Sequence, residues 1–355
     1  MSEGPALDRA AVEAVDRQRM IDDVLAGPLQ LGDALWRAQS AAVRPTDRAG
    51  GLVVCGMGGS AIGGDLAVAA LGDRATRPLS VVRGYALASW TAPDTLVLCS
   101  SYSGHTEETL ACFEAAGAVG AQRIVLTTGG PLAELAREEG VPVIGVPAGM
   151  QPRAAVLYGM VGSLECAALC GAAPALHSEI DAATALIDRL VEEWGPDAPE
   201  DALSKRLARR LHGRLPVVHG AGPTVAVARR WKTQLNENAE VPAFWSSLPE
   251  ANHNEICGWP RAAQAPAAAV FLEDPDQHPR VEQRMQVMCG QLERDGVASV
   301  RVRARGESRL ERVLSHVLLG DLVSLYLAVL GGVDPTPVEA VERFKESLGD
   351  RATRA

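Results

Sequence analysis

The densest group of chemically active side chains lies in the stretch NENAEVPAFWSSLPEANHNEICGW, which begins at Asn236. Glu237 offers a carboxylate and His253 an imidazole, and both group types can act in general acid–base catalysis. The aromatic residues of the stretch are Phe244, Trp245 and Trp259. We therefore predict a catalytic loop whose aromatic walls exclude water or pack an interface. Taken singly, Glu237 also fits a solvated helix-end carboxylate, and His253 fits a structural loop histidine.

A second group consists of hydroxyl side chains and glycines in two turns, each between a predicted strand and a predicted helix. The turns are GMGGSA and SSYSGHTEET, and the residues concerned are Gly58, Gly59, Ser60, Ser101, Ser103 and Thr106. Backbone N–H groups at a helix start, together with hydroxyl donors, bind a phosphate dianion without a lysine. Such turns meet at the carboxyl edge of an open parallel sheet, where ligands usually bind. The alternative is that the serines are ordinary helix caps.

The first turn also admits a dinucleotide-binding interpretation. Gly56, Gly58 and Ala61 fit the G-x-G-x-x-A pattern at the end of a strand. An NAD site usually has an acidic residue at the end of the next strand to bind the ribose hydroxyls, and the sequence has Arg83 there. This disfavours NAD and leaves NADP open.

The elements that must position these groups alternate between short apolar runs and helical stretches, which predicts an α/β fold with parallel sheets flanked by helices. In the first half the runs are GLVVCGMGG, PLSVVRGY, TLVLCSSYSG, RIVLTTGG and VPVIGVPAG. Helices are expected at about residues 7–26, 28–43, 154–170, 177–194, 309–330 and 337–348. The segment from Asn236 to Trp259 has no clear helical or strand period.

The second half repeats the texture of the first. PVVHGAGPTVAVARRW, AAVFLEDPDQHPRVEQRM and SVRVRARGESRLERVL resemble in kind three of the earlier strand-turn-helix units. We therefore expect two similar doubly wound domains: residues 1–194 with the N-terminal helices, a linker at 195–202, and residues 203–355 with the C-terminal helix. The turn EDPDQ replaces the hydroxyl turn of the first half, and its carboxylates repel phosphate, so one phosphate site per chain is expected.

Composition restricts the partners. A formal net charge of -10 disfavours nucleic acid and anionic membranes, which both need a basic face. The first residues are charged and no later apolar run looks long enough to span a membrane, so a cytoplasmic protein is expected. Seven cysteines in apolar contexts argue for buried thiols rather than disulfides. A zinc interpretation of HNEIC fails because no P-C-x-x-C follows.

The motifs together resemble a known family. CGMGGSAIGGDL, SSYSGHTEETL, QPRAAV, NENAEVPAFWSSLPEANHNEICGW and DPTPVEAVERFKESLG are similar, in this order, to the bifunctional phosphoglucose/phosphomannose isomerases, a metal-free branch of the sugar isomerase domain superfamily. The resemblance extends from about Met20 to Gly349, and the combination of NENA with NHNEI is its most specific part. It implies interconversion of fructose 6-phosphate with glucose 6-phosphate and mannose 6-phosphate through an enediolate, without a cofactor.

The resemblance also implies roles for individual residues. Glu237 looks like the base, His253 the ring-opening group, Lys345 the C-terminal lysine, and Arg153 the cation that stabilises the enediolate. Phosphate binding would fall on Ser60, Ser101, Ser103 and Thr106, and substrate contacts on the loop with Gly58 and Gly59. The family forms homodimers in which the partner lends the histidine, so a homodimer with His253 contributed across the interface is implied.

Two positions depart from the family pattern: His105 stands where asparagine is more usual, and Glu240 where lysine is more usual. Protonated His105 would add positive charge beside the phosphate. Of the 34 cationic residues only Lys205, Lys232 and Lys345 are lysines, and we expect Lys345 to be kept because an ammonium group can donate a proton. The alternatives are a non-catalytic sugar-phosphate sensor, an isomerase of another sugar phosphate and an NADP-dependent reductase, and the preferred aldose epimer stays open.

Overall fold

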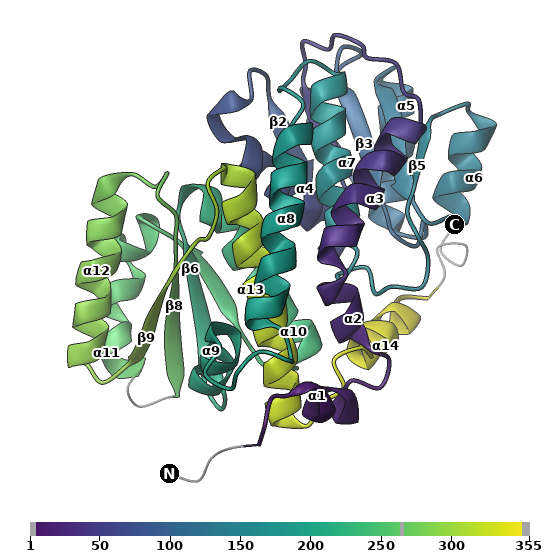
Figure 1. The fold of residues 1–355 in the computed structure, drawn as a ribbon. Helices are drawn as coiled ribbons and strands as arrows, with labels where there is room; N and C mark the ends of the chain where they lie inside the picture. The colour runs from purple at the N-terminus through teal and green to yellow at the C-terminus, as the bar shows by residue number, and fades with distance from the viewer. Residues whose placement is uncertain (1–4, 263–265, 350–355) are drawn as a thin grey trace.

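Two parallel sheets form the two lobes of the protein (Figure 1). The computed structural model describes residues 5–262 and 266–349. The first sheet has the order β2-β1-β3-β4-β5, with β1 Leu52–Cys55, β2 Leu79–Val82, β3 Leu96–Ser100, β4 Gln122–Thr127 and β5 Val143–Gly145. The second has the order β7-β6-β8-β9, with β6 Leu215–Gly220, β7 Phe244–Ser247, β8 Ala267–Glu273 and β9 Ala298–Arg303. The second sheet thus repeats the order of the first without its last strand, which confirms the predicted pair of similar α/β domains.

Helices cover both faces of the first sheet and fill the space between the lobes (Figure 1). Those packed on or near the first sheet are α3 Gly27–Ser40, α4 Gly58–Leu71, α5 Glu107–Ala118, α6 Gly130–Glu138 and α7 Val156–Leu169. The remaining helices are α1 Arg9–Val15, α2 Met20–Leu25, α8 His177–Trp194, α9 Leu203–Leu211, α10 Val225–Asn238, α11 Trp259–Ala262, α12 Pro279–Arg294, α13 Arg309–Gly331 and α14 Glu339–Leu348. Helices α4 and α7 approach closely, because a side chain at Gly63 would lie 2.7 Å from the backbone of Gly159.

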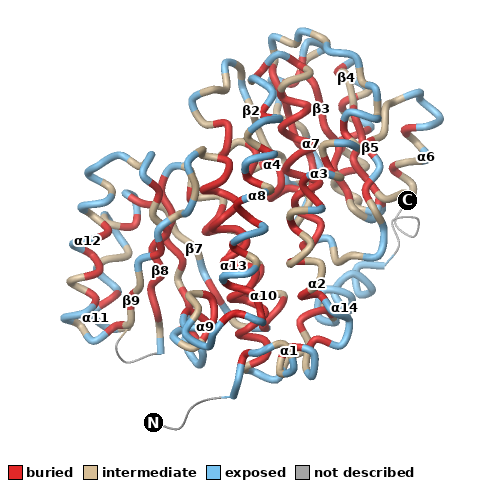
Figure 2. The backbone as a smooth tube through the Cα atoms, in the orientation of Figure 1, coloured by how far each residue is buried: buried red, intermediate tan, exposed pale blue. Residues whose placement is uncertain are grey.

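One hydrophobic core is shared by the two lobes, as the buried segments in Figure 2 show. Strand residues alternate between faces, so Leu52 and Val54 of β1 point into this core. Val53 and Cys55 point the other way, into a smaller core beneath α5 and α6. The lobes are therefore held in a fixed relation by burial of the helices between them.

Helix α13 lies at the centre of this shared core and contacts α8, α9, α10 and α4. By length and composition it is apolar enough to cross a membrane, contrary to the expectation that no run in the sequence is. Nearly all of its most apolar window is buried inside the protein. Its apolar residues are thus explained by core packing.

The predicted helix at residues 7–26 is in fact two helices. The buried carboxylate of Asp16 accepts the backbone N–H groups of Met20 and Ile21, at 2.9 and 2.7 Å. It thereby caps the start of α2 and ends the preceding helix, because a side chain that satisfies backbone donors competes with helix continuation.

The segment predicted as a catalytic loop contains a strand. Residues 244–247 form β7, an edge strand that pairs in parallel with β6 from Val217↔Phe244 to Gly220↔Ser247. A four-residue strand at a sheet edge does not need to alternate polar and apolar residues. This explains why the sequence from Asn236 to Trp259 shows no strand period.

Residues 195–202, which were expected to form a linker, are held at their start by hydrogen bonds. Lys205, which is 1% exposed, donates from Nζ to the carbonyl oxygens of Pro196 and Ala198, at 3.0 and 2.6 Å. A buried ammonium with backbone acceptors is stable only if the segment holds its shape. The domain boundary at 195–202 stays a prediction, but hydrogen bonds to Lys205 hold the start of this segment in place.

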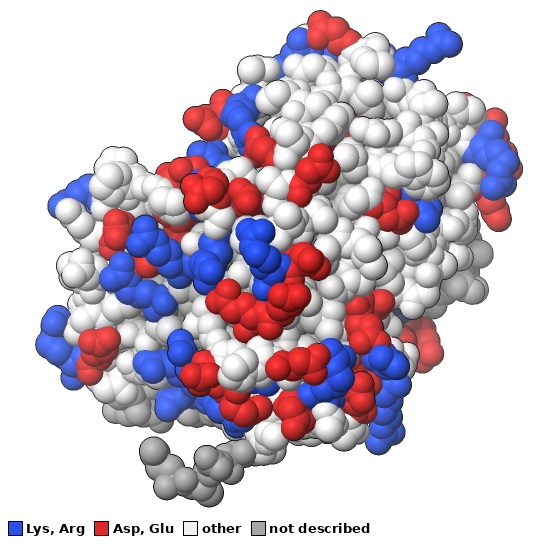
Figure 3. Space-filling view, viewed as in Figure 1, with Lys and Arg blue, Asp and Glu red and all other residues white. Residues whose placement is uncertain are grey.

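The acidic turn after β8 differs from the hydroxyl turn of the first lobe, as expected. Asp274 accepts from Arg312 Nε at 3.0 Å, and Asp276 accepts from Arg312 Nη2 and Arg309 Nε at 2.5 and 2.9 Å. These carboxylates bind the chain's own arginines. On the face shown in Figure 3, acidic and basic side chains are likewise interspersed rather than gathered in a basic patch.

Candidate active site

The two hydroxyl turns meet at the carboxyl edge of the first sheet. They follow β1 and β3, which pair directly, from Leu52↔Leu96 to Cys55↔Cys99. Ser60, in the first turn of α4, accepts the backbone N–H of Tyr102 at 3.2 Å. The predicted convergence of the two turns is therefore observed, and we call Ser60 with residues 101–106 the hydroxyl cradle.

The hydroxyl groups of the second turn organise its backbone. Ser101 Oγ lies 2.8 Å from Thr106 Oγ1 and accepts the Gly104 N–H at 3.1 Å. Ser103 Oγ accepts the His105 N–H at 3.3 Å. A hydroxyl oxygen that accepts from the backbone still has its own hydrogen to donate. The hydroxyl groups thus lie together at the start of α5, and their binding of a phosphate stays a prediction.

His105 is exposed, and its Nδ1 lies 2.8 Å from the Ser103 carbonyl oxygen. This contact fixes the imidazole beside the turn. A contribution of His105 to phosphate binding stays a prediction.

Gly59 brings the cradle against the segment that carries Arg153. A side chain at this position would lie 2.7 Å from the Pro152 carbonyl oxygen and 3.1 Å from Arg153 Cα. Only glycine allows this approach of two backbones. Ser60 and Arg153 are therefore held on neighbouring segments.

The buried Arg153 guanidinium is held by acceptors from both halves of the chain. Nε donates to Asn238 Oδ1 at 2.6 Å, and Nη1 donates to Gln151 Oε1 at 3.2 Å. Nη2 donates to the carbonyl oxygens of Pro335 and Thr336, at 2.6 and 2.9 Å. Guanidinium has five N–H bonds, and these acceptors use four of them. The fifth is on Nη1.

That nitrogen faces the predicted base. Arg153 Nη1 lies 3.7 Å from Glu237 Oε2, beyond hydrogen-bond range, and the Glu237 side chain is 35% exposed while that of Arg153 is 4% exposed. Burial lowers the pKa of Arg153, and the Glu237 carboxylate opposes that shift. The arrangement leaves one charged N–H and one accessible carboxylate side by side for a ligand.

Residues outside the predicted set fix this pair. Arg230 Nη2 donates to the Arg153 carbonyl oxygen at 2.9 Å, and Arg230 forms a buried ion pair with Asp321 at 2.7 Å. Asn238 Nδ2 donates to Ser324 Oγ at 2.8 Å. Arg230 and Asn238 lie on the buried face of α10, and buried polar side chains on an amphipathic helix were the only sequence signal for them.

Asn236 and Asn238 flank Glu237 in the sequence, but each of them binds another partner. Asn236 Nδ2 donates to the Val241 carbonyl oxygen at 2.8 Å, and Asn238 binds Arg153 instead. Residues two positions apart on a helix point to different sides, so neighbours in sequence do not flank each other in space. Glu237 is positioned by the last turn of α10 rather than by its neighbours.

His253 and Lys345 are the two predicted catalytic residues that lie on exposed elements of the chain. His253 ends the short helical turn Glu250–His253 and is exposed, and Lys345 lies on α14, which buries none of its residues. Among the described residues, no hydrogen bond or ion pair connects either side chain with Glu237 or Arg153. Contacts between described residues therefore connect the cradle, Arg153 and Glu237, whereas the roles of His253 and Lys345 stay predictions.

The aromatic residues do not form one wall. Trp245 lies under Arg229, with 4.8 Å from the guanidinium carbon to the ring centre, and Phe244 is 57% exposed. Neighbouring strand residues point to opposite faces. Trp259 is buried in the second lobe beside His219, with ring centres 5.9 Å apart.

Arg83, which left an NADP site open, pairs with Asp65. Asp65 also accepts from Arg229 Nη1 at 3.1 Å. Both arginines therefore neutralise a carboxylate on α4, and this contact explains the arginine after β2 without a nucleotide phosphate.

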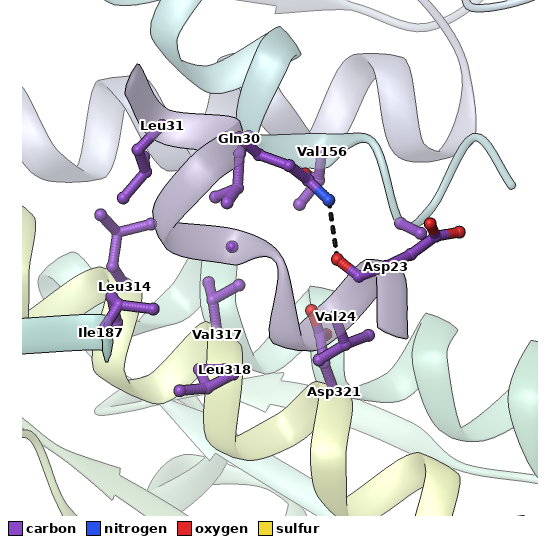
Figure 4. A pocket seen from close by; sticks show the side chains of 13 residues that line it. Asp23, Val24, Gln30, Leu31, Val156, Ile187, Leu314, Val317, Leu318 and Asp321 are labelled. Atoms are coloured by element: carbon purple, nitrogen blue, oxygen red, sulfur yellow. Dashed lines mark hydrogen bonds between the residues drawn. The ribbon is translucent and has the colours of Figure 1, made fainter. Parts of the chain in front are cut away.

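An apolar pocket lies between the N-terminal helices, α7, α8 and α13 (Figure 4). Its wall includes Ala154 and Val156, and the Gln30 side chain donates to the Asp23 carbonyl oxygen at 2.7 Å. Asp321 also lines it and is already paired with Arg230. Neither Arg153 nor any of the cradle hydroxyls lines this pocket.

His219 is a buried histidine that the sequence did not single out. It is 0% exposed, packs on Phe271 with ring centres 4.8 Å apart, and lies 3.7 Å from Glu255, too far for a hydrogen bond. Burial lowers the pKa of His219 to about 4. The unfolded chain binds a proton near pH 6.5 and the folded chain does not, so stability falls as the pH falls from 6.5 towards 4.

We expect His219→Leu to reduce this pH dependence. The shift corresponds to about 3 kcal/mol over the whole window, so the loss of unfolding free energy between pH 7.5 and 4.5 should shrink by about 2 to 3 kcal/mol. Urea unfolding at both pH values measures it. His212→Gln, which changes an exposed histidine, is the control, and an equal pH dependence in wild type and His219→Leu would contradict the assignment.

Comparison with known proteins places this geometry in a family context. Residues 200–348 match the family of the bacterial phospho-glucose isomerase C-terminal SIS domain. The chain is 40% identical over 304 residues to the bifunctional phosphoglucose/phosphomannose isomerase of Caldicellulosiruptor bescii, covering 84% of this chain and 89% of that one. It is 38% identical to the enzyme of the same name from Aquifex aeolicus, covering 85% and 91%.

The fold also matches solved structures. A hypothetical protein from Thermus thermophilus superimposes with a TM-score of 0.75 at 16% identity, over 96% of this chain and 94% of that one. At this identity the match concerns the fold alone, and it supports the two-domain α/β arrangement.

Proposed function

The chain belongs to the bifunctional phosphoglucose/phosphomannose isomerase family, and we propose that its cradle, Arg153 and Glu237 interconvert fructose 6-phosphate with glucose 6-phosphate and mannose 6-phosphate. As an aldose–ketose isomerase it must move a proton between C1 and C2 of a hexose phosphate. The observation that carries the assignment of these residues is the Arg153 N–H that no described residue accepts, beside the accessible carboxylate of Glu237.

The proposed reaction begins with phosphate binding. Ser60, Ser101, Ser103 and Thr106 donate to the phosphate oxygens, and the glycine loop at Gly58 and Gly59 lets the backbone approach. Phosphate binding here supplies affinity and aligns the sugar chain towards Arg153.

Proton transfer then falls to Glu237. Its carboxylate removes the proton from C1 of the open ketose, and the electron pair forms the C1–C2 double bond of the enediolate while negative charge develops on the C2 oxygen. The free Arg153 N–H stabilises that charge, because a preorganised cation acts where the charge appears. A proton passes from O1 to O2, so the C1 carbonyl forms as Glu237 returns its proton to C2, and the face of C2 presented to Glu237 determines which epimer forms.

Ring opening and the dimer are a further part of the proposal. Hexose phosphates are mostly cyclic, and we assign ring opening to His253, contributed by a second copy, with Lys345 as an assisting proton donor. The support is that both side chains are exposed in the single chain while the family resemblance gives them roles at the site. Mixing two inactive variants tests the contribution across subunits.

We place the enzyme in the cytoplasm. All seven cysteines are free thiols, and six of them are buried. Free thiols are typical of a reducing compartment, which supports this placement.

The direct test is an assay of EDTA-treated protein on fructose 6-phosphate, scoring glucose 6-phosphate and mannose 6-phosphate separately. Because Arg153 supplies the positive charge that a metal would otherwise provide, EDTA is expected to leave turnover unchanged. Loss of activity in EDTA with recovery in zinc would contradict the metal-free mechanism. No turnover, with fructose 6-phosphate still raising the melting temperature, would favour a sugar-phosphate sensor.

A further inference from the structure

Tyr102 lies between two cradle serines, but its side chain serves the segment that leads to Arg153. Its hydroxyl donates to the Pro147 carbonyl oxygen at 3.0 Å and accepts the Met150 N–H at 2.9 Å. One hydroxyl group thus binds two backbone groups three residues apart, immediately before Gln151 and Arg153.

The backbone of Tyr102 is fixed within the cradle. Its N–H donates to Ser60 Oγ at 3.2 Å, and its carbonyl oxygen accepts the N–H and the hydroxyl of Thr128 at 2.9 and 2.8 Å. The residue is therefore anchored by the turns after β1, β3 and β4. Any shift of the cradle moves the phenol with it.

The segment that the phenol holds has no secondary structure to stabilise it. It runs from the end of β5 to the start of α7 at Val156, and Gly149 has a φ of +101°, a conformation that other residues rarely adopt. Arg153 is fixed through its side chain by Asn238 of the second lobe. Tyr102 fixes the approach to Arg153 from the first lobe.

The phenol has the right protonation state for both bonds. Burial raises the pKa of Tyr102, whereas the bond from the Met150 N–H opposes that shift. The hydroxyl thus stays neutral at physiological pH and can donate to Pro147 while it accepts from Met150.

We propose that Tyr102 is a positioning residue that couples the phosphate cradle to Arg153, so that the bound phosphate and the enediolate-stabilising N–H are held at a set separation. This inference rests on the proposed function of the same site. Tyr102 touches no reacting atom and acts through the segment 147–153. Losing its hydroxyl should therefore weaken stabilisation of the transition state while phosphate binding persists.

The test is Tyr102→Phe, which removes only the hydroxyl. We expect kcat on fructose 6-phosphate to fall about 10- to 30-fold, with KM and the inhibition constant of inorganic phosphate changed less than about threefold. Affinity for 5-phosphoarabinonate, whose planar carboxylate imitates the charged enediolate, should fall by the same factor as kcat/KM. If Tyr102 only stabilised the fold, the affinities for inorganic phosphate and 5-phosphoarabinonate would not change by such different factors.

Tyr158→Phe is the matched control, since it removes another phenol that donates a single hydrogen bond, to Asp33 at 2.9 Å. Its kcat should stay within about twofold of wild type. Equal losses in the two variants, or a rise in KM at unchanged kcat in Tyr102→Phe, would overturn the inference.

Hydrogen exchange separates the inference from the proposed function. In Tyr102→Phe the Met150 amide loses its acceptor, so its exchange should accelerate whether or not the protein is an isomerase. Unchanged exchange at Met150 would overturn the inference even in an active enzyme. Wild-type protein without turnover would overturn the proposed function alone.

Discussion

Glu237→Gln is expected to lower kcat for fructose 6-phosphate by about three to four orders of magnitude, with KM changed only a few-fold. Glutamine has nearly the same shape but cannot accept the C1 proton. Because Glu237 lies 3.7 Å from Arg153, the substitution removes a long ion pair but no hydrogen bond between them, and the fold should persist. A coupled assay measures turnover, and exchange of the C1 proton with deuterated water measures the proton transfer itself.

Glu240→Gln provides the control for this prediction. Glu240 is exposed two residues beyond α10, and its substitution changes the net charge by the same amount. Its kcat should stay within about twofold of wild type. Near wild-type turnover or proton exchange in Glu237→Gln would remove Glu237 from the mechanism.

The same variant tests whether His253 acts across subunits. Glu237→Gln subunits and His253→Ala subunits should each be inactive as homodimers. If each site takes its histidine from the partner, a mixed dimer contains one intact site, and an equal mixture should recover about a quarter of wild-type activity. No recovery after subunit exchange would indicate that His253 does not act in this way.

Arg153→Lys is expected to lower kcat by about two to three orders of magnitude with a modest effect on KM. An ammonium keeps the positive charge but lacks the planar fork that binds Asn238, Pro335 and Thr336 while it presents Nη1 to Glu237. The positive charge would remain, but its donor would no longer be held in the orientation that Arg153 Nη1 has. Steady-state kinetics on both aldoses, with a melting curve to confirm folding, measure the effect.

Ser103→Ala separates binding from chemistry in this experiment. Ser103 is exposed on the cradle, so its loss should mainly raise KM, by about 10-fold, at nearly constant kcat. The two variants should thus affect different kinetic constants. An Arg153→Lys enzyme with wild-type kcat would show that the guanidinium does not stabilise the enediolate.

Local patterns in the sequence predicted the strands, their turns and the two repeated domains. Short apolar runs ending in glycine or serine specify buried parallel strands, and the five runs of the first half correspond to β1 to β5. The meeting of Ser60 with the 101–106 turn followed from the general rule for open parallel sheets and needed no detail of side-chain packing. The acidic turn after β8 could be distinguished from the cradle by its residue types, because carboxylates repel phosphate.

Other features depended on contacts that hydrophobic periodicity does not identify. The helix break at Asp16 and the burial of Lys205 result from side-chain bonds to backbone groups four to nine residues away, whereas the edge strand β7 forms by pairing with the distant β6. Local propensity is a weak prior where such tertiary contacts decide the outcome.

The sequence by itself determined which chemical groups are present and on which turns and helix ends they lie, because strand, turn and cap preferences act over a few residues. Only the tertiary structure decided which of them meet. Arg153 binds Asn238, 85 residues away, and the Pro335 carbonyl oxygen, 182 residues away, and so has one N–H left for a ligand. Packing of α10 and α13 between the two lobes creates these contacts, since hydrogen bonds between distant segments form only where burial of apolar surface holds those segments together.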